Sequence, residues 1–304
     1  MIGYCCINQT LRKQKVYTGR SIIRRTFTID KASELALQNC RDLLTILQWN
    51  KKNDIDVFRV SSNLFPRITD RQTEYKLSDL RDYQEICSTL AEAGEYAFNN
   101  SMTLSCHPNP YTVLGSDKNN VVENSIDEIE MHELIAKLLF PNDQKEFNIN
   151  FHVGCSFSVD AAERFCRNFD RLSDSVKKKV VVENDDKPNG WSVRKLYEHI
   201  HRRVGIPITF DYHHSQFSRE SDISIEEEFQ LAKSTWSRKM EVHFSESPDL
   251  SKPVRKHSDY ITQMVPEWLF DNDKTYVLFE CKEKELAVMQ YRDKYFRDKT
   301  TEGN

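Results

Sequence analysis

Two hydrophobic patterns alternate along this chain. Short runs rich in Val, Ile and Phe predict buried strands, and the longer stretches between them place apolar residues at helical spacing. The clearest helical stretch is Lys31–Asn50, where Leu35, Leu43 and Leu47 share a face. The eight predicted strands are Ile2–Tyr4, Val57–Ser61, Thr103–His107, Ile149–Val153, Val180–Glu183, Ile208–Asp211, Glu241–Phe244 and Val277–Glu280. The eight predicted helices are Lys31–Asn50, 78–99, 121–139, 159–171, 192–204, 225–234, 259–271 and 283–297.

Each predicted strand is followed by a predicted helix. Eight consecutive βα units favour a (β/α)8 TIM barrel, formed as a single domain over residues 1–304. No linker rich in Pro, Gly or Ser divides the chain. A doubly wound sheet is the alternative, but no G-x-G-x-x-G turn is present, and a phosphate-binding loop of that kind is disfavoured as well.

The composition is typical of a soluble globular protein, with 38% hydrophobic and 30% charged residues. No apolar run approaches the length of a membrane span, and the chain after Met1 lacks the features of a signal peptide. The eight cysteines form no C-x-x-C pair, which favours scattered reduced thiols. We therefore expect a cytoplasmic protein that is neither secreted nor embedded in a membrane.

The charge is distributed unevenly. The formal net charge of −4 argues mildly against a nucleic-acid partner. Residues 1–29, however, contain no acidic residue and six basic ones: Arg12, Lys13, Lys15, Arg20, Arg24 and Arg25. This segment is either a solvated loop or a basic loop that contacts phosphates.

Acidic and imidazole side chains occupy six successive predicted strands at or near their ends. They are His107, His152, Glu183, Asp211, His243 and Glu280, and His213 and His214 follow Asp211. In a TIM barrel these strand ends meet at the C-terminal face, where clustered carboxylates repel one another unless cations neutralise them. Imidazole and carboxylate together suit Zn²⁺, Mn²⁺ or Fe²⁺, and the set exceeds the needs of a single zinc. The pattern therefore predicts two or more bridged metals, an arrangement suited to phosphoester hydrolysis.

Several sequence blocks resemble the UV damage endonuclease family. Gly3-Tyr4-Cys5-Cys6-Ile7-Asn8 is similar to its N-terminal G-Y-x-x-x-N, and Phe58–Pro66 is similar to F-R-[IV]-S-S-x-x-x-P. Further blocks follow in order: His107-Pro108, Phe151–Gly154, Val182–Asp186 and Phe279–Lys282. The resemblance covers nearly the whole chain. It implies a TIM barrel related to endonuclease IV that nicks DNA immediately 5′ of UV photoproducts, leaving a 3′-hydroxyl and a 5′-phosphate.

The resemblance also implies individual roles. The metal ligands would be His107, His152, Glu183, Asp211, His243, His257 and Glu280, joined by His214, with His213 as the rival at that position. Tyr4, Asn8 and Tyr111 would contact the lesion. Two or three divalent ions are expected, with Mn²⁺ the first choice and Zn²⁺, Co²⁺ or Mg²⁺ as alternatives.

Three positions depart from the family pattern. The family's H-P-G-Q-Y segment is His107–Tyr111 here, so Pro110 replaces the glutamine that enters the lesion and cannot hydrogen-bond a base through its side chain. Asp70 stands where the family has a metal-binding histidine, and a carboxylate can still bind Mn²⁺. Glu241 stands where some members carry a carboxylated lysine, which makes it a bridging or supporting candidate.

The predicted activity is therefore metal-dependent nicking of damaged double-stranded DNA by a monomer in the cytoplasm, nucleoid or nucleus. Glu183, Glu241 and Lys282 are the catalytic candidates, although Lys282 could instead form a salt bridge to a neighbouring carboxylate. Arg12, Arg24 and Arg25 would hold phosphates. The alternatives are an abasic-site endonuclease of the endonuclease IV type and a metal-dependent sugar isomerase on the same barrel.

Overall fold

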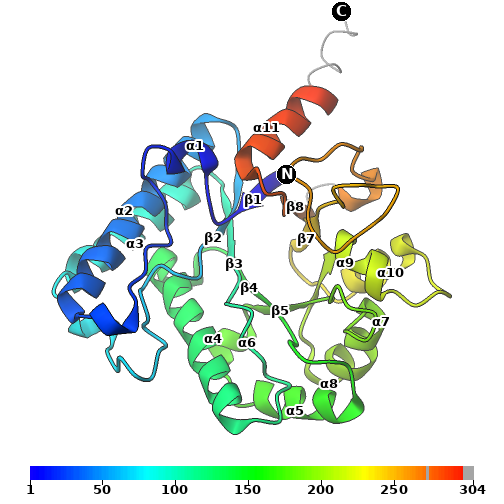
Figure 1. The fold of residues 1–304 in the computed structure, drawn as a ribbon, viewed down its shortest axis with the longest axis horizontal. Helices are drawn as coiled ribbons and strands as arrows, with labels where there is room; N and C mark the ends of the chain where they lie inside the picture. Colours follow the sequence, from blue (N-terminus) through cyan, green and yellow to red (C-terminus); the bar gives the residue numbers. More distant parts are fainter. Residues whose placement is uncertain (272–273, 297–304) are drawn as a thin grey trace, which may run out of the picture.

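The computed structural model describes residues 1–271 and 274–296, which form a closed barrel of eight parallel strands (Figure 1). Each strand pairs with the next along the chain, and β8 closes the barrel on β1. The strands are β1 (Ile2–Cys5), β2 (Val57–Val60), β3 (Thr103–Cys106), β4 (Phe147–His152), β5 (Val180–Glu183), β6 (Ile208–Asp211), β7 (Met240–Phe244) and β8 (Thr275–Phe279). The predicted TIM barrel and all eight predicted strands are confirmed, with ends that agree within two residues.

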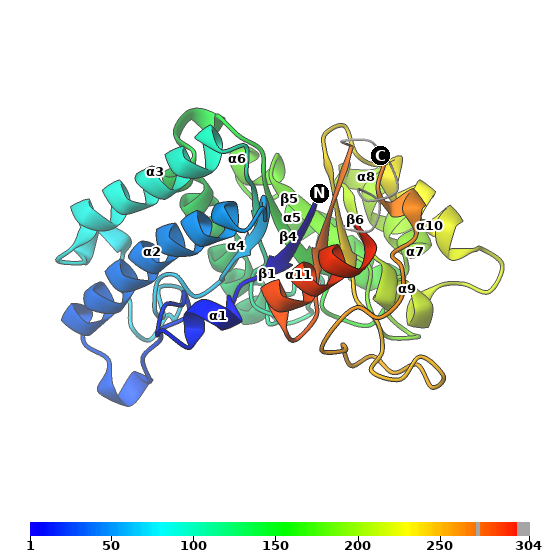
Figure 2. The same cartoon turned by 90° about the horizontal axis from the view of Figure 1, so that it is seen from above.

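Helices surround the barrel, as Figures 1 and 2 show from two directions. They are α1 (Gln9–Arg12), α2 (Ile29–Lys52), α3 (Tyr83–Asn99), α4 (Asn119–Leu139), α5 (Val159–Phe169), α6 (Asp174–Lys177), α7 (Val193–Leu196), α8 (Arg202–Val204), α9 (Tyr212–Ser218), α10 (Ile225–Lys233) and α11 (Lys284–Tyr295). A π-helical turn, Tyr197–His201, joins α7 to α8. The two longest helices coincide with predicted ones, since α2 and α4 contain the predicted ranges 31–50 and 121–139.

Local sequence explains the main elements. Val180, Val181 and Val182 are all buried, because a parallel strand inside a barrel has no solvent-facing side. The hydroxyl of Thr28 accepts the backbone N–H of Lys31 at 3.2 Å and so begins α2. Among the described residues, no helix combines the length and apolar character needed to cross a bilayer.

The predicted helix over 259–271 is wrong. Within 259–271, which the structure describes throughout, only a 3₁₀ turn forms, at Glu267–Leu269. Pro266 disfavours helical backbone in the residue before it. In addition, the buried carboxylate of Glu246 accepts the backbone N–H and the hydroxyl of Thr262 at 2.7 and 2.6 Å. These contacts hold an irregular loop where the apolar spacing suggested a helix.

The barrel has two unlike ends. The connections after β1 and β7 both extend from the end where the strands finish (Figure 2). At the opposite end, where the strands begin, a cavity of about 480 Å³ is lined by residues that include Met1, Lys145, Asn148, Lys239 and Tyr276. The predicted domain 1–304 includes residues 297–304, which lie outside the described residues.

The buried Glu228 on α10 makes the stability of the fold depend on pH. Its carboxylate accepts the hydroxyl of Ser215 on α9 at 2.6 Å, and burial raises its pKa to about 7 from an ordinary value of 4.5. The pKa of Glu228 is higher in the folded protein than in the unfolded chain. Such a carboxyl adds its full contribution to the free energy of unfolding below its unfolded-state pKa, and this contribution is lost as the pH rises through its folded-state pKa. At about 1.4 kcal/mol per pH unit, the loss is at most about 3 kcal/mol.

Glu228→Gln is therefore expected to raise the melting temperature at pH 8.5 and to change it little at pH 4.5, because glutamine stays neutral at both values. Glu226→Gln, at an exposed position of the same helix, is the matched control and should behave as the parent at both pH values. Thermal unfolding followed by circular dichroism makes the comparison. A gain that is equal at pH 4.5 and 8.5 would contradict burial of the ionised carboxylate as the cause.

Candidate metal centre at the mouth of the barrel

The ends of six successive strands bring acidic and imidazole side chains to one mouth of the barrel. Because all strands run parallel, the last residue of each reaches the same face. His152, Glu183 and Asp211 are the last residues of β4, β5 and β6. His107 and Glu280 directly follow β3 and β8, and His243 lies one residue before the end of β7.

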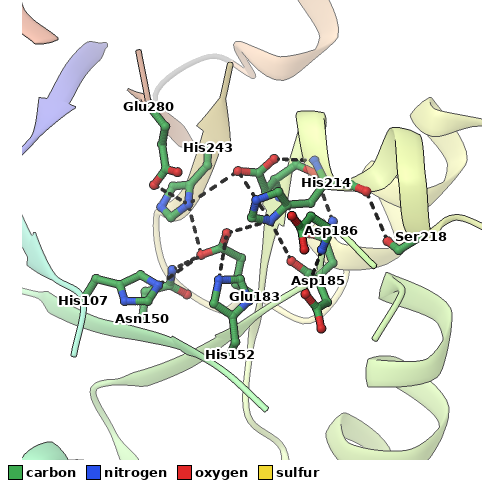
Figure 3. Close-up of polar contacts among 12 residues, drawn as sticks. His107, Asn150, His152, Glu183, Asp185, Asp186, His214, Ser218, His243 and Glu280 are labelled. Carbon is green, nitrogen blue, oxygen red and sulfur yellow. Dashed lines mark hydrogen bonds and ion pairs between the residues drawn. The ribbon is translucent and has the colours of Figure 1, made fainter. Parts of the chain in front are cut away.

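Glu183 lies at the centre of this cluster (Figure 3). One carboxylate oxygen, Oε2, lies 3.6 Å from Nε2 of His107 and 3.1 Å from Nδ1 of His243. The other, Oε1, lies 3.6 Å from Nε2 of His152 and 3.2 Å from Nδ1 of His214. Three histidines at or near strand ends, and His214 on α9, therefore converge on one buried carboxylate.

The electrostatics of Glu183 follow from this arrangement. Burial opposes ionisation of the carboxyl, but the nearby imidazoles of His243 and His152, followed by His107 and His214, outweigh it and hold its pKa well below the ordinary range. The side-chain amide of Asn150 also donates a hydrogen bond to Oε2. Glu183 is thus fixed as a buried anion with donor groups on both oxygens.

Asp211 is fixed by its own backbone surroundings. Its Oδ1 accepts the backbone N–H of His214 at 2.7 Å, so Asp211 caps α9 and directs the start of that helix. Asn184 pairs with the backbone of Asp211 in both directions, at 2.8 and 3.0 Å. The other carboxylate oxygen, Oδ2, is buried without a hydrogen-bond partner and lies 4.0 Å from Nδ1 of His243.

His243 is oriented by a carboxylate deeper in the barrel, Glu241. Its Nε2 lies 2.9 Å from Oε1 of Glu241, two residues earlier on β7, where alternation along a strand directs both side chains to the interior. Glu241 also accepts hydroxyl hydrogen bonds from Ser105 at 3.2 Å and Tyr276 at 2.7 Å. If Nε2 carries the proton toward Glu241, Nδ1 of His243 presents its lone pair to the cluster, the tautomer that metal-binding histidines adopt.

A chain of hydrogen bonds continues from Glu241 toward the end of the barrel where the strands begin. The side-chain amide N–H of Asn148 donates to the Tyr276 hydroxyl at 2.7 Å, and the guanidinium of Arg238 donates to the side-chain oxygen Oδ1 of Asn148 at 3.0 and 3.1 Å. This polar column, formed by Glu241, Tyr276, Asn148 and Arg238, connects the cluster to the cavity at the opposite end of the barrel. The barrel interior is therefore polar along this path.

Glu280 is paired with a partly buried cation, Arg59. The guanidinium of Arg59, on β2, donates to Oε1 of Glu280, which also lies 3.5 Å from Nδ1 of His243. Burial opposes ionisation of Glu280, but Arg59 and then His243 lower the pKa of its carboxyl below the ordinary value. Arg59 belongs to the F-R-V-S-S segment, and its role at the cluster was not predicted from the sequence.

Two groups within the described residues have the geometry to hold a metal ion: His107, His152 and Glu183, and Glu183, Asp211 and His243. In each group the ligand atoms lie within 4.8 Å of one another, and Glu183 belongs to both. Oδ2 of Asp211 and Nδ1 of His243 are buried without hydrogen-bond partners, which an ion between them would satisfy. The residues present therefore fit metal ions, which either group could hold and to which Glu183 could contribute in both.

His213, His214 and His257 lie together beside the second group. Only His214 contacts Glu183 directly, and its Nδ1 also lies 3.0 Å from the carbonyl oxygen of Asn184. The ring of His213 lies 5.4 Å from that of His257, and the rings of His214 and His257 are 6.2 Å apart. This placement favours His214 over His213 as the residue that joins the cluster, with His257 at its edge.

Asp70 and Lys282 form ion pairs outside the two groups. Asp70 contacts Arg24 and Arg67, and Lys282 lies 3.1 Å from Oδ1 of Asp259 in an exposed pair. The salt bridge considered for Lys282 is thus the arrangement that the structure shows. Neither residue belongs to a group that could hold a metal among the described residues.

Tyr4 and Asn8 are buried in the structure, contrary to the expectation that they reach a lesion. The hydroxyl of Tyr4 donates to Asn50 on α2 at 2.6 Å and accepts from the Asn8 amide at 2.9 Å. Asn8 also caps α1 by accepting the backbone N–H of Leu11 at 2.8 Å. The local sequence fixes the start of α1, and neither side chain has surface to offer a ligand.

A cleft of about 910 Å³ lies over the ends of the first four strands, and its lining includes Asn109 and Gly154, which follow His107 and His152 of the cluster by two residues each. Pro110 and Tyr111 line it, and Tyr111 is 83% exposed. Arg24, Arg67 and Arg71 line it as well. Arg12 and Arg25 are exposed but do not line this cleft.

Known proteins resemble this chain over most of its length. The UV-endonuclease UvdE family matches residues 1–301. A protein named UV-damage endonuclease from Schizosaccharomyces pombe is 31% identical over 97% of this chain, which spans about half (50%) of that relative's length. The crystal structure of SacUVDE superposes on this chain with a TM-score of 0.82, 27% sequence identity and 96% coverage of each chain. Endonuclease IV from Thermus thermophilus, at 12% identity, a TM-score of 0.57 and coverage of 83% of this chain and 94% of its own, shares the fold.

Proposed function

Because this chain belongs to the UV-endonuclease UvdE family, we propose that it is a DNA repair endonuclease that nicks damaged duplex DNA immediately 5′ of UV photoproducts. Hydrolysis of one phosphodiester bond would leave a 3′-hydroxyl and a 5′-phosphate. The observation that carries the proposal is Glu183, shared by two ligand groups at the mouth of the barrel, next to a cleft lined by arginines and by the exposed Tyr111. We further propose that the protein acts as a monomer wherever its DNA is stored, in the cytoplasm, nucleoid or nucleus.

The ligand types support Mn²⁺ as the first choice, with Zn²⁺, Co²⁺ and Mg²⁺ as alternatives, because imidazole and carboxylate groups are mixed. His107, His152 and Glu183 would hold one ion, and Glu183, Asp211 and His243 a second. His214, His257 and Glu280 lie close enough to complete the second site or to form a third. Bound divalent ions would polarise the scissile phosphate and supply a water of lowered pKa.

The chain's own residues orient the reaction. Glu241 fixes His243, Arg59 fixes Glu280, and Asn150 fixes Glu183, so the central ligands need little rearrangement on binding substrate. The recessed cluster requires the damaged dinucleotide to leave the base stack. A lesion that is already unstacked costs less to extrude than an intact pair, which favours damaged DNA.

A single nicking assay tests the proposal. Duplexes that differ only in carrying one defined photoproduct, one abasic site or no damage are incubated with purified protein, with and without a chelator. We expect cutting of the photoproduct duplex that the chelator removes and that added Mn²⁺ restores. Cutting of the abasic duplex alone would replace the proposal with an abasic-site endonuclease activity of the endonuclease IV type. In a separate assay with sugars, turnover of an aldose to a ketose would replace it with sugar isomerisation.

Tyr111 is expected to contribute to damage selection. Its exposed ring beside the cleft can stack in the gap that an extruded lesion leaves, an interaction worth about 1–3 kcal/mol per base. Tyr111→Ala should therefore weaken binding to photoproduct DNA by roughly tenfold, and Tyr111→Phe should retain most of it. Fluorescence anisotropy in a chelator measures the affinity without cleavage. Phe98→Ala, which removes an exposed aromatic ring from α3, is the control, and an equal effect there would disprove the assignment.

A further inference from the structure

The carboxylate of Asp70 joins two separate loops of the catalytic face. Its two oxygens accept hydrogen bonds from Nε and Nη2 of Arg24 at 2.7 and 3.1 Å, and Oδ2 also accepts Nη1 of Arg67 at 2.8 Å. The backbone N–H of Gln72 donates to Oδ1 at 3.1 Å. Arg24 comes from the loop after β1, whereas Arg67, Asp70 and Gln72 come from the loop after β2. The carboxylate thus acts as a hub between the loops.

The Arg67 side of this hub is anchored firmly. Nε of Arg67 donates to the carbonyl oxygen of Ile22, in the loop after β1, and the Thr73 hydroxyl donates to the Arg67 carbonyl at 2.9 Å. The backbone of Arg67 has a φ of +59°, a left-handed conformation that residues with a side chain rarely adopt. Such conformations persist where surrounding contacts determine them, and they concentrate at binding sites.

The hub faces the cleft beside the metal cluster. Arg24, Arg67 and Asp70 all line it, together with Tyr111. Only 11% of the Asp70 side chain is exposed, whereas 55% of the Arg24 side chain remains accessible. Asp70 engages one edge of the Arg24 guanidinium through Nε and Nη2, and no other partner of that guanidinium is found among the described contacts. The remaining donors are available to an anion, and a guanidinium fork matches a phosphate.

We propose that Asp70 is a positioning residue that orients Arg24 and Arg67 to bind phosphates of the DNA in this cleft, and that it is not a metal ligand. This inference rests on the proposed DNA endonuclease function. Its support is the contact pattern: within the described part of the chain, every side chain that donates to the Asp70 carboxylate belongs to an arginine, and no imidazole of the cluster is among its partners. Hydrogen bonding from Arg24, outweighing partial burial, lowers the pKa of the Asp70 carboxyl, so the hub keeps its charge at neutral pH.

The test separates phosphate positioning from metal binding. Asp70→Asn removes the charge and keeps the shape, and Arg24→Gln removes one of the two oriented groups from an exposed position. Each variant should weaken DNA binding, measured in the presence of a chelator, by roughly tenfold. Each should also reduce the slope of log Kd against log salt concentration by about one. The amount of metal bound per protein, measured by elemental analysis without chelator, should stay unchanged. The double variant should weaken binding no more than one single variant, because both disrupt the same contact.

The control is Asp222→Asn, which breaks another arginine–aspartate pair, with Arg194 at 2.9 Å, away from the cleft. It carries the same change of charge and should bind DNA as the parent does. Loss of metal from Asp70→Asn would overturn the proposal in favour of a ligand role, and so would unchanged or tighter DNA binding. Failure of the proposed function would show instead in the parent protein, as an absence of any preference for photoproduct DNA.

Discussion

Glu183→Gln is expected to lower the rate of nicking of photoproduct DNA by about 10³-fold or more. Glu183 is the one residue that belongs to both groups with metal-binding geometry in the described part of the chain, and four histidines contact its two oxygens. A neutral amide cannot bridge two cations as a carboxylate does. The loss of several kcal/mol of charge stabilisation in the transition state corresponds to a rate change of this size.

The fold should survive this substitution. Glutamine has the same shape as glutamate, and its carbonyl oxygen can still accept the hydrogen bond that the Asn150 amide donates. Single-turnover nicking gives the rate, elemental analysis the metal content, and circular dichroism the integrity of the barrel. Glu198→Gln, at an exposed position, controls for loss of one negative charge and should be fully active. Activity of Glu183→Gln within tenfold of the parent would refute the central role of the carboxylate.

Glu241→Gln is expected to weaken metal binding by about 10–100-fold, with a parallel fall in kcat, although Glu241 itself need not touch the substrate. Partners that hydrogen-bond a metal-binding histidine typically have effects of this size when they are removed. The neutral amide still fills the site but no longer places a negative charge 2.9 Å from Nε2 of His243. Tyr276→Phe, which removes one hydroxyl donor to the same carboxylate, should show a smaller effect in the same direction.

A fall in kcat and in metal affinity without a change in KM would distinguish a positioning role of Glu241 from general damage to the fold. Competition with a graded series of chelators gives the metal affinity, and steady-state nicking gives kcat and KM. The KM for DNA should remain near that of the parent, because Glu241 is buried inside the barrel, away from the cleft. Saturating Mn²⁺ should restore part of the lost rate. An unchanged metal affinity would remove the argument that Glu241 acts through His243.

Most residues of the cluster could be predicted from the sequence because each buried parallel strand appears as a short apolar run that ends at a polar residue. A run such as Val180–Val182 followed by Glu183 marks both the strand and its end, and the barrel brings such ends together. The layer beneath was missed. Asn148 and Asn150 precede the predicted His152 at a period of two along β4, which places all three on the inward face, but polar residues at this period also mark solvent-facing positions. The sequence alone does not decide between these readings.

Long-range pairing explains the other differences. The burial of Tyr4 depends on Asn50, which is distant in sequence and reaches it only when α2 packs on the barrel. The irregular loop at 259–271 depends on the buried Glu246, and the contacts of Asp70 depend on an arginine from another loop. The family resemblance placed Tyr4 at the lesion and Asp70 at a metal, and helical spacing predicted a helix over 259–271. The partner, which determines what the role is, came from the fold.

The two unlike ends of the barrel have a practical consequence for tethering. Met1 lines the cavity where the strands begin, whereas the metal cluster and the cleft lie where they finish. A linker, fluorophore or partner module fused ahead of Met1 would leave from the end opposite the mouth that carries the acidic and imidazole cluster. A protein attached to a surface through that position would keep this mouth directed toward solution, which suits single-molecule tests of the proposed damage recognition on stretched DNA.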